Sequence, residues 1–249
     1  ASLGCNHCYA ETIAKRFGKS GQVFEGAYDY QADGWSGDVT FHEHKLLEPT
    51  KVKMPQLIFA NSMSDICHPK VQRYWVDQMV DVIAATPQHF YLFLTKRPNR
   101  IRRYWTSSCL DALIFDATFG ENNIAMGTSI ESNDYLWRAD KLLEQWPGDC
   151  FLSIEPLIES VTLREILKHD GGRIKQVIVG GESGKGSRPM AEDWARQLRD
   201  ETKEAGRAFF FKQWGDQMGD AYRKREGLGP IGRNLDGRAH GGKARRHVA

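Results

Sequence analysis

Two cysteines near the N-terminus have the spacing of metal ligands. Cys5 and Cys8 form a C-x-x-C pair. This spacing is typical of zinc knuckles, of dithiol redox sites and of loops that hold iron–sulfur clusters. A zinc site would need two further ligands, and the sequence has no second cysteine pair. Histidines are the other candidate ligands: His7, His42, His44 and His68. A cluster held by three cysteines would need a further thiolate, which we expect upstream of Ala1.

Polar residues follow six short apolar runs, at 57–60, 90–94, 124–127, 151–154, 176–179 and 208–211. Such runs are typical of parallel strands that are buried on both faces. Because parallel α/β folds bind ligands at the carboxyl ends of their strands, the polar residues there are candidate site residues. They are Ser62, Ser64, Asp65, Lys96, Arg97, Ser129, Glu131, Glu155, Gly180, Gly181, Glu182, Lys212, Gln213 and Trp214.

The elements that must position these residues are repeated βα units. Amphipathic helical patterns separate the apolar runs, which recur about every 26–34 residues. The sequence therefore predicts an α/β fold, a full or partial (β/α) TIM-like barrel with parallel strands, and leaves an open doubly wound sheet as the alternative. We expect one barrel domain over residues 1–221. Within it, residues 18–56 form an irregular insertion with a short strand near 39–41.

Composition and charge narrow the class of protein. The 249 residues carry a formal charge of +2 and are 41% hydrophobic, which excludes intrinsic disorder. No apolar run approaches the ~18 residues of a membrane span. Five cysteines, an odd number, favour a reducing compartment, and we expect a cytoplasmic protein.

The C-terminal segment 222–249 is a basic tail. It has eight Lys and Arg residues against two acidic ones. It is either a solvated terminus or an arm that contacts a polyanion such as DNA phosphate. Since the rest of the chain is close to neutral, contact with nucleic acid would have to be local.

Several stretches resemble a known family. Residues 4–11 (GCNHCYAE) resemble the cluster-binding loop of radical S-adenosylmethionine (SAM) enzymes. Together with seven further stretches in order, they resemble a phage-associated, three-cysteine, radical-SAM-like family, long described as phage proteins of unknown function. These stretches are SMSD (62–65), LTKRP (94–98), GTSIE (127–131), LSIEPL (152–157), VIVGGESG (177–184), FFFKQWG (209–215) and GRNLDGR (232–238).

The resemblance implies a [4Fe–4S] cluster on Cys5, Cys8 and an upstream cysteine, with SAM as the second cofactor. It implies a radical SAM isomerase in phage thymidine hypermodification, which moves a glycyl substituent on the thymine methyl from a nitrogen link to a carbon link. Its partners would be modified DNA and an external electron donor such as flavodoxin or ferredoxin, in the host cell cytoplasm. A base within duplex DNA would have to be flipped out of the helix.

The resemblance and the strand-end positions together suggest a role for each candidate residue. Ser62, Ser64 and Asp65 would hold the amino group of SAM, and Ser129 and Glu131 its ribose or carboxylate. Gly180, Gly181 and Glu182 would contact adenosine, and Glu155 is a further cofactor-binding candidate. On the substrate side, Lys96, Arg97 and Lys212 would pair with carboxylate or phosphate, Gln213 would contribute to binding, and Trp214 would stack on a base.

Two other functions remain open at this point. One is a non-catalytic, nucleic-acid-binding barrel with a zinc knuckle. The other is a radical SAM enzyme of DNA repair or RNA modification, because the substrate is chosen by loop details that fold class does not reveal.

Overall fold

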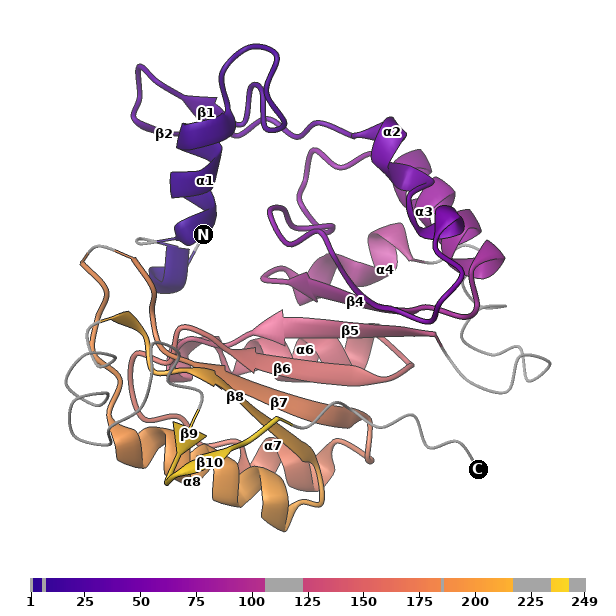
Figure 1. Ribbon diagram of the computed structural model, residues 1–249. Coiled ribbons are helices and arrows are strands. Elements are labelled where there is room, and N and C mark those ends of the chain that lie inside the picture. The colour runs from indigo at the N-terminus through magenta and orange to yellow at the C-terminus, as the bar shows by residue number, and fades with distance from the viewer. Residues whose placement is uncertain (1, 6–7, 106–122, 185, 217–233, 242–249) are drawn as a thin grey trace. The chain divides into compact units, whose positions relative to one another are not determined.

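The computed structural model describes residues 2–5, 8–105, 123–184, 186–216 and 234–241 (Figure 1). The chain divides into two compact units. The C-terminal unit joins Ala1–His7 to Met126–Ala249, and the N-terminal unit is Cys8–Ala125. Cys5 therefore belongs to the C-terminal unit and Cys8 to the N-terminal unit.

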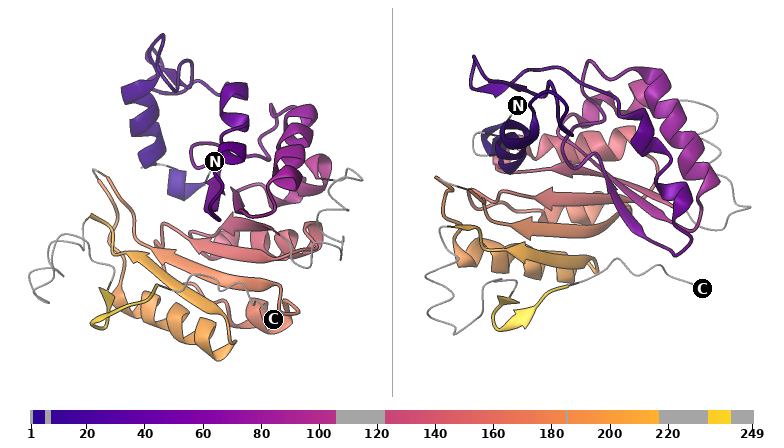
Figure 2. Two further views of the ribbon diagram at one scale, coloured as in Figure 1. Left: turned by 45° about the vertical axis from the view of Figure 1, so that its right-hand side comes forward. Right: turned by 45° about the horizontal axis from the view of Figure 1, so that its top comes forward.

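The C-terminal unit is built on parallel strands β5 (Ile124–Ser129), β6 (Cys150–Ile154), β7 (Ile174–Gly180) and β8 (Ala208–Gln213). Every residue of β5 and β6 is buried, as expected for strands that are apolar on both faces. The helices are α6 (Trp137–Gln145), α7 (Arg164–His169) and α8 (Glu192–Glu204). Helix α6 packs on β6, and α8 packs on β7 and β8, through buried apolar residues such as Leu142 and Leu198 (Figure 2).

Short elements complete this unit: the 3-10 helices η1 (Leu3–Cys5) and η5 (Asn133–Tyr135), and a hairpin of β9 (Asn234–Leu235) and β10 (Arg238–Ala239). The hairpin lies along β8, where the Phe211 N–H donates to the His240 carbonyl oxygen. Residues 234–241, which we assigned to the basic tail, thus pair with the sheet. The rest of 222–249 lies outside the described residues.

The N-terminal unit holds the strand pair β3 (Leu57–Ala60) and β4 (Phe90–Thr95), again parallel. Its helices are α1 (Tyr9–Phe17), α2 (Glu43–Leu46), α3 (Arg73–Ala85) and α4 (Ile101–Tyr104), with η2 (Pro49–Lys51) and η3 (Pro98–Arg100). A small hairpin, β1 (Tyr28–Asp29) and β2 (Gly34–Trp35), lies within the predicted insertion. The strand predicted near 39–41 is wrong: these residues form no strand, and the Phe41 ring instead stacks on Trp75 at 5.4 Å.

The strand order β3-β4-β5-β6-β7-β8 follows the chain without reversal. A doubly wound sheet would reverse direction at a switch point, whereas a (β/α) barrel adds its parallel strands in sequence. The predicted fold class is therefore confirmed in its partial-barrel form, and the six apolar runs correspond to β3–β8. None of the described helices combines the length and the apolar character that crossing a membrane requires.

Candidate functional site

Cys5 lies beside a buried carboxylate at the carboxyl end of β5. The Ser2 hydroxyl donates to Glu131 Oε1 at 2.5 Å, and the same Ser2 Oγ lies 3.7 Å from Cys5 Sγ. A Cβ on Gly4 would lie 2.6 Å from Glu131 Cγ and 2.9 Å from Pro156 Cδ. Because only glycine permits this approach, Gly4 lets η1 rest on the carboxyl ends of β5 and β6.

Glu131 forms an ion pair that is closed to solvent. Arg138 Nη1 lies 2.9 Å from Glu131 Oε2 and also donates to the Ser129 carbonyl oxygen at 2.9 Å. The side chains of Glu131 and Arg138 are 0% and 5% exposed. The guanidinium lies 4.1 Å from the centre of the Tyr135 ring, and its Nε has no hydrogen-bond partner among the described residues. We call Glu131–Arg138 the closed pair.

Glu182, after β7, pairs with an arginine a few residues along its own loop. Oε2 accepts the Arg188 backbone N–H at 2.8 Å and Nε at 2.9 Å, while Nη2 reaches Oε1 at 2.5 Å. The hydrogen bonds to Glu182 raise the pKa of Arg188 above its ordinary value. Such a two-pronged contact fixes the geometry of the loop as well as its charge.

The backbone N–H of Gly181, directly after β7, is already engaged within the protein. The Gly181 N–H already donates to the Gln213 carbonyl oxygen at 2.9 Å. A Cβ on Gly181 would lie 2.0 Å from the Trp214 carbonyl oxygen. The structural reason for this glycine is therefore the crossing of two protein segments, and contact of Gly181 with adenosine stays a prediction.

Glu155, after β6, pairs with Lys212 on β8. Lys212 Nζ lies 3.0 Å from Glu155 Oε1, and the Ser153 hydroxyl donates to Oε2 at 3.1 Å. The side chains of Glu155 and Lys212 are 18% and 47% exposed. We call Glu155–Lys212 the open pair. Next to it, the Gln213 amide donates to the Gly181 carbonyl oxygen at 3.3 Å and also contacts Ser183 Oγ.

Trp214 is a packing residue in this arrangement. Its side chain is 2% exposed, and its indole N–H donates to the Asn234 carbonyl oxygen at 2.9 Å. Its ring meets Phe211 edge-on at 4.7 Å. The ring is buried and its N–H occupied in this arrangement, and stacking of Trp214 on a base stays a prediction.

Asp65, in the N-terminal unit, fastens the loop after β3 to the end of β4. Oδ1 accepts the Cys67 N–H at 2.9 Å and the Thr95 hydroxyl at 2.6 Å. Oδ2 accepts the Lys96 N–H at 3.1 Å and Arg97 Nη1 at 2.7 Å. Since a carboxylate has about four acceptor positions, Asp65 has none left for the amino group of SAM in this arrangement. Arg97 is likewise engaged by Asp65.

The neighbouring serines stay accessible. Ser62 and Ser64 are exposed, and Ser64 Oγ accepts from Asn61 Nδ2 at 3.1 Å. Asn61 has a φ of 59°, in the left-handed region that asparagine tolerates better than most residues. Ser62 and Ser64 thus remain candidates for ligand contact in the N-terminal unit.

Residues 1–243 match the model of a protein family described as "Protein of unknown function (DUF5131)". The chain belongs to this family. No curated protein and no solved structure matches it. The family description names no chemistry.

The thiols of the chain fall into two groups. Cys67 and Cys150 are buried, and burial raises the pKa of each to about 12, with Asp65 adding to the effect on Cys67. Cys5 and Cys8 are half-buried. A cysteine binds a metal as its thiolate, which favours Cys5 and Cys8 over the buried pair. Cys109 lies outside the described residues.

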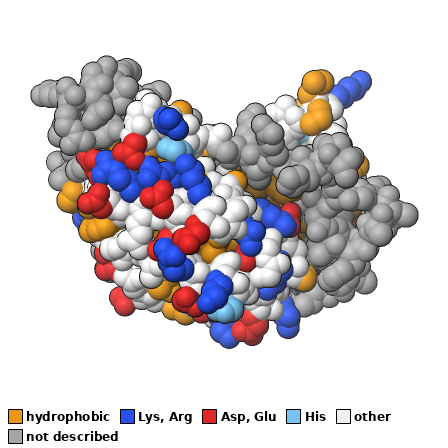
Figure 3. Space-filling model, turned by 90° about the horizontal axis from the view of Figure 1, so that it is seen from below, with side chains coloured by type: hydrophobic (Ala, Val, Ile, Leu, Met, Phe, Trp, Pro, Cys, Tyr) orange, Lys and Arg blue, Asp and Glu red, His pale blue; other side chains and the backbone are white. Residues whose placement is uncertain are grey.

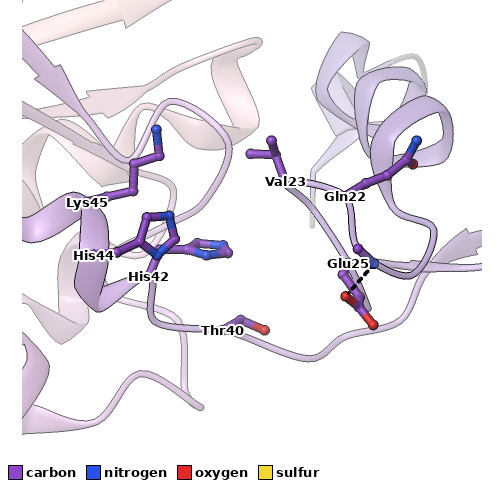
Figure 4. A pocket seen from close by; sticks show the side chains of 8 residues that line it. Gln22, Val23, Glu25, Thr40, His42, His44 and Lys45 are labelled. Atoms are coloured by element: carbon purple, nitrogen blue, oxygen red, sulfur yellow. Dashed lines mark hydrogen bonds between the residues drawn. The ribbon is translucent and has the colours of Figure 1, made fainter.

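A zinc site would need a complete set of ligands. Within the described ranges, no group of three His, Cys, Asp or Glu side chains is placed to hold a metal ion. His7 lies outside these ranges. His42 and His44 line a surface pocket of about 570 Å³ in the N-terminal unit, where the nearby Glu25 carboxylate accepts the Gly21 N–H at 2.8 Å (Figure 4). Ligands beyond Cys5 and Cys8 would therefore have to come from elsewhere.

Three side chains that pair with the candidate carboxylates escaped the sequence analysis: Ser2, Arg138 and Arg188. Arg138 stands in an amphipathic helix, where a single arginine normally marks the solvent face. Only its burial against Glu131 identifies it. Arg188 follows the glycine-rich segment. The sequence signal for its pairing with Glu182 was that the two residues are close along the chain.

Proposed function

We propose that this chain is a radical SAM enzyme that acts on a nucleic-acid base. Its most specific form is an isomerase that converts an N-linked glycyl thymidine to the carbon-linked isomer in phage DNA. The observation that supports this is the position of Cys5. One cysteine of the C-x-x-C pair lies next to Ser2 and Glu131, at the strand ends where parallel α/β folds carry their chemistry.

The thiols suit the proposed cofactor. Cys5 and Cys8 are half-buried rather than enclosed, and Cys8 immediately precedes the nine-residue helix α1. The positive end of a helix dipole favours a thiolate. With a third thiolate, these two would hold a [4Fe–4S] cluster, which supplies the electron for reductive cleavage of SAM.

The chain's own residues would hold the loop and limit access of water. Ser2 connects Cys5 to Glu131, and Arg138 neutralises Glu131 in the interior. Glu182 and Arg188 fix the loop after β7. Among the described candidate residues, the open pair and the exposed serines Ser62 and Ser64 can be reached by ligands. Exclusion of water matters because a reactive intermediate must meet its substrate before solvent.

DNA and an electron donor such as flavodoxin or ferredoxin are the proposed partners. A polyanion would be attracted by cations that are not committed to internal ion pairs. Arg97 is committed to Asp65, and Arg196 and Arg199 on α8 are committed to Asp236. The face seen in Figure 3 accordingly mixes acidic and basic side chains. Most cations of segment 222–249 lie outside the described residues.

The test is anaerobic reconstitution with iron and sulfide, followed by SAM, dithionite and DNA that carries the N-linked glycyl thymidine. We expect a brown, oxygen-sensitive protein that releases 5′-deoxyadenosine and methionine, with the rearranged nucleoside identified by mass spectrometry. C5A and C8A should abolish cleavage, whereas C150A, which alters a buried thiol at the start of β6, should retain it. A colourless protein with stoichiometric zinc and no cleavage would refute the proposal and favour the zinc-knuckle function.

A further inference from the structure

The open pair differs from the other two ion pairs described at the carboxyl ends of β5–β7. Glu131 and Glu182 are buried and each meets an arginine. Glu155 meets Lys212 instead, and solvent can reach both the carboxylate and the ammonium of this pair. Two opposite charges 3.0 Å apart at a site-bearing strand end therefore face the exterior.

The sequence makes room for this pair across an intervening strand. Strands β6, β7 and β8 are consecutive neighbours, so Glu155 must pass the end of β7 to reach Lys212. Gly180 ends β7, and a Cβ there would lie 2.6 Å from Glu155 Oε1. Any other residue at position 180 would push the carboxylate away, whereas the Ser153 hydroxyl holds it in place. The two charges are thus built into a defined position.

The chemistry of the pair suits exchange with a ligand. Partly exposed ion pairs contribute little to stability, so breaking this one costs little. Lysine presents three donors on a flexible stem and can turn from one carboxylate to another. A ligand with an ammonium and a carboxylate attached to one carbon could satisfy both side chains at once.

We propose that Glu155 and Lys212 form a receptor for the α-amino-acid group of a ligand. Lys212 would bind the carboxylate and Glu155 the ammonium. This inference rests on the proposed function, which offers two sources of the group. They are the glycyl substituent of the modified thymidine and the methionyl end of SAM.

The test measures binding by calorimetry, with the full chain as isolated and after anaerobic reconstitution, in both cases without reductant. One probe pair is N-linked glycyl thymidine and its methyl ester, which lacks the carboxylate charge. The other is SAM and methylthioadenosine, which lacks the amino acid. The variants are K212M, E155Q and the double variant, and E204Q is the control because it removes the exposed ion pair to Arg164 between α7 and α8.

We expect the wild-type chain to prefer the member with the complete amino-acid group in at least one probe pair by about 10- to 100-fold, as charge-assisted hydrogen bonds allow. K212M and the double variant should lose that preference, while E204Q should keep it. The probe pair that shows the effect identifies the source of the amino-acid group. E155Q should weaken binding of every probe in the responsive pair that carries the ammonium, the methyl ester included, and should leave methylthioadenosine binding unchanged.

Equal binding of both members of each pair by the wild type would overturn the inference, as would a preference that survives in K212M. Its failure is distinguishable from failure of the proposed function. A chain that cleaves SAM but shows no Lys212-dependent preference refutes only the receptor. A chain that shows the preference but never cleaves SAM refutes only the radical chemistry.

Discussion

The closed pair and the open pair occupy equivalent positions at the ends of neighbouring strands, β5 and β6, yet they differ in environment. Glu131 is sealed beneath Ser2 and Arg138, whereas Glu155 and Lys212 remain in contact with solvent. A buried charge is costly unless paired, so the closed pair must stay intact for the unit to fold. An exposed pair carries little stability and is free to serve a ligand. Equivalent strand-end positions can thus have opposite roles.

The largest expected effect is a difference in reaction rate between the buried and the accessible thiols. Because the pKa of Cys67 and of Cys150 is about 12, both stay protonated at pH 8, and burial also blocks reagents. We expect Cys5 and Cys8 to react with iodoacetamide at least about a hundredfold faster than these two, since the thiolate is the nucleophile. Peptide mapping by mass spectrometry measures each site. Equal labelling of Cys150 in the folded chain would contradict the burial described here.

Removing one partner of the closed pair should destabilise the protein strongly. R138M leaves Glu131 as an uncompensated buried charge, and we expect a loss of about 3–5 kcal/mol in the free energy of unfolding. Urea denaturation followed by circular dichroism measures it. E131Q combined with R138M should recover part of the loss, because neither charge is then left alone. If R138M unfolded like the wild type, the closed pair would not be a structural ion pair.

Adding a methyl group at Gly181, where its backbone crosses that of Trp214, should cost less stability than R138M. G181A places Cβ 2.0 Å from the Trp214 carbonyl oxygen, and backbone must shift to accept it. We expect a loss of about 1–3 kcal/mol, typical of overpacking. G241A in the same unit, where a new Cβ meets nothing within 4 Å, is the matched control. A G181A chain as stable as G241A would show that the crossing is looser than described.

Neutralising the open pair should barely change stability. The double variant E155Q and K212M should shift the free energy of unfolding by about 0–1 kcal/mol, because partly exposed ion pairs contribute little. The same denaturation assay used for R138M gives a direct comparison. A loss as large as that of R138M would make the two pairs equivalent and remove the argument for a ligand role.

The smallest expected effect is on the β9–β10 hairpin and depends on pH. Burial, followed by the charge of Lys203, lowers the pKa of His240 below its ordinary value. Protonation therefore favours the undocked hairpin: docking is fully stabilised above the unfolded pKa of about 6.5 and weakens as pH falls through the folded value. We expect faster amide exchange at Phe211 near pH 5 than near pH 7, after correction for intrinsic rates. H240Q should abolish the difference.

Much of the fold could be predicted from the sequence because its strands are apolar on both faces. The six runs are β3–β8, and their order along the chain is their order in the sheet. The hairpin of residues 234–239 escaped prediction because its strands are two residues long and its anchors are tertiary: the Trp214 indole N–H, and Arg196 and Arg199 against Asp236. Short strands of this kind carry no periodic signal.

The sequence by itself determined which side chains follow each strand, because the position of a residue after an apolar run is a local property. It also carried the family resemblance through its ordered motifs. Only the tertiary structure decided which of those side chains are closed and which are open. The partners that decide this come from distant parts of the chain, as with Ser2 and Glu131, which are 129 residues apart. Burial and pairing arise from folding and leave no mark on the local sequence.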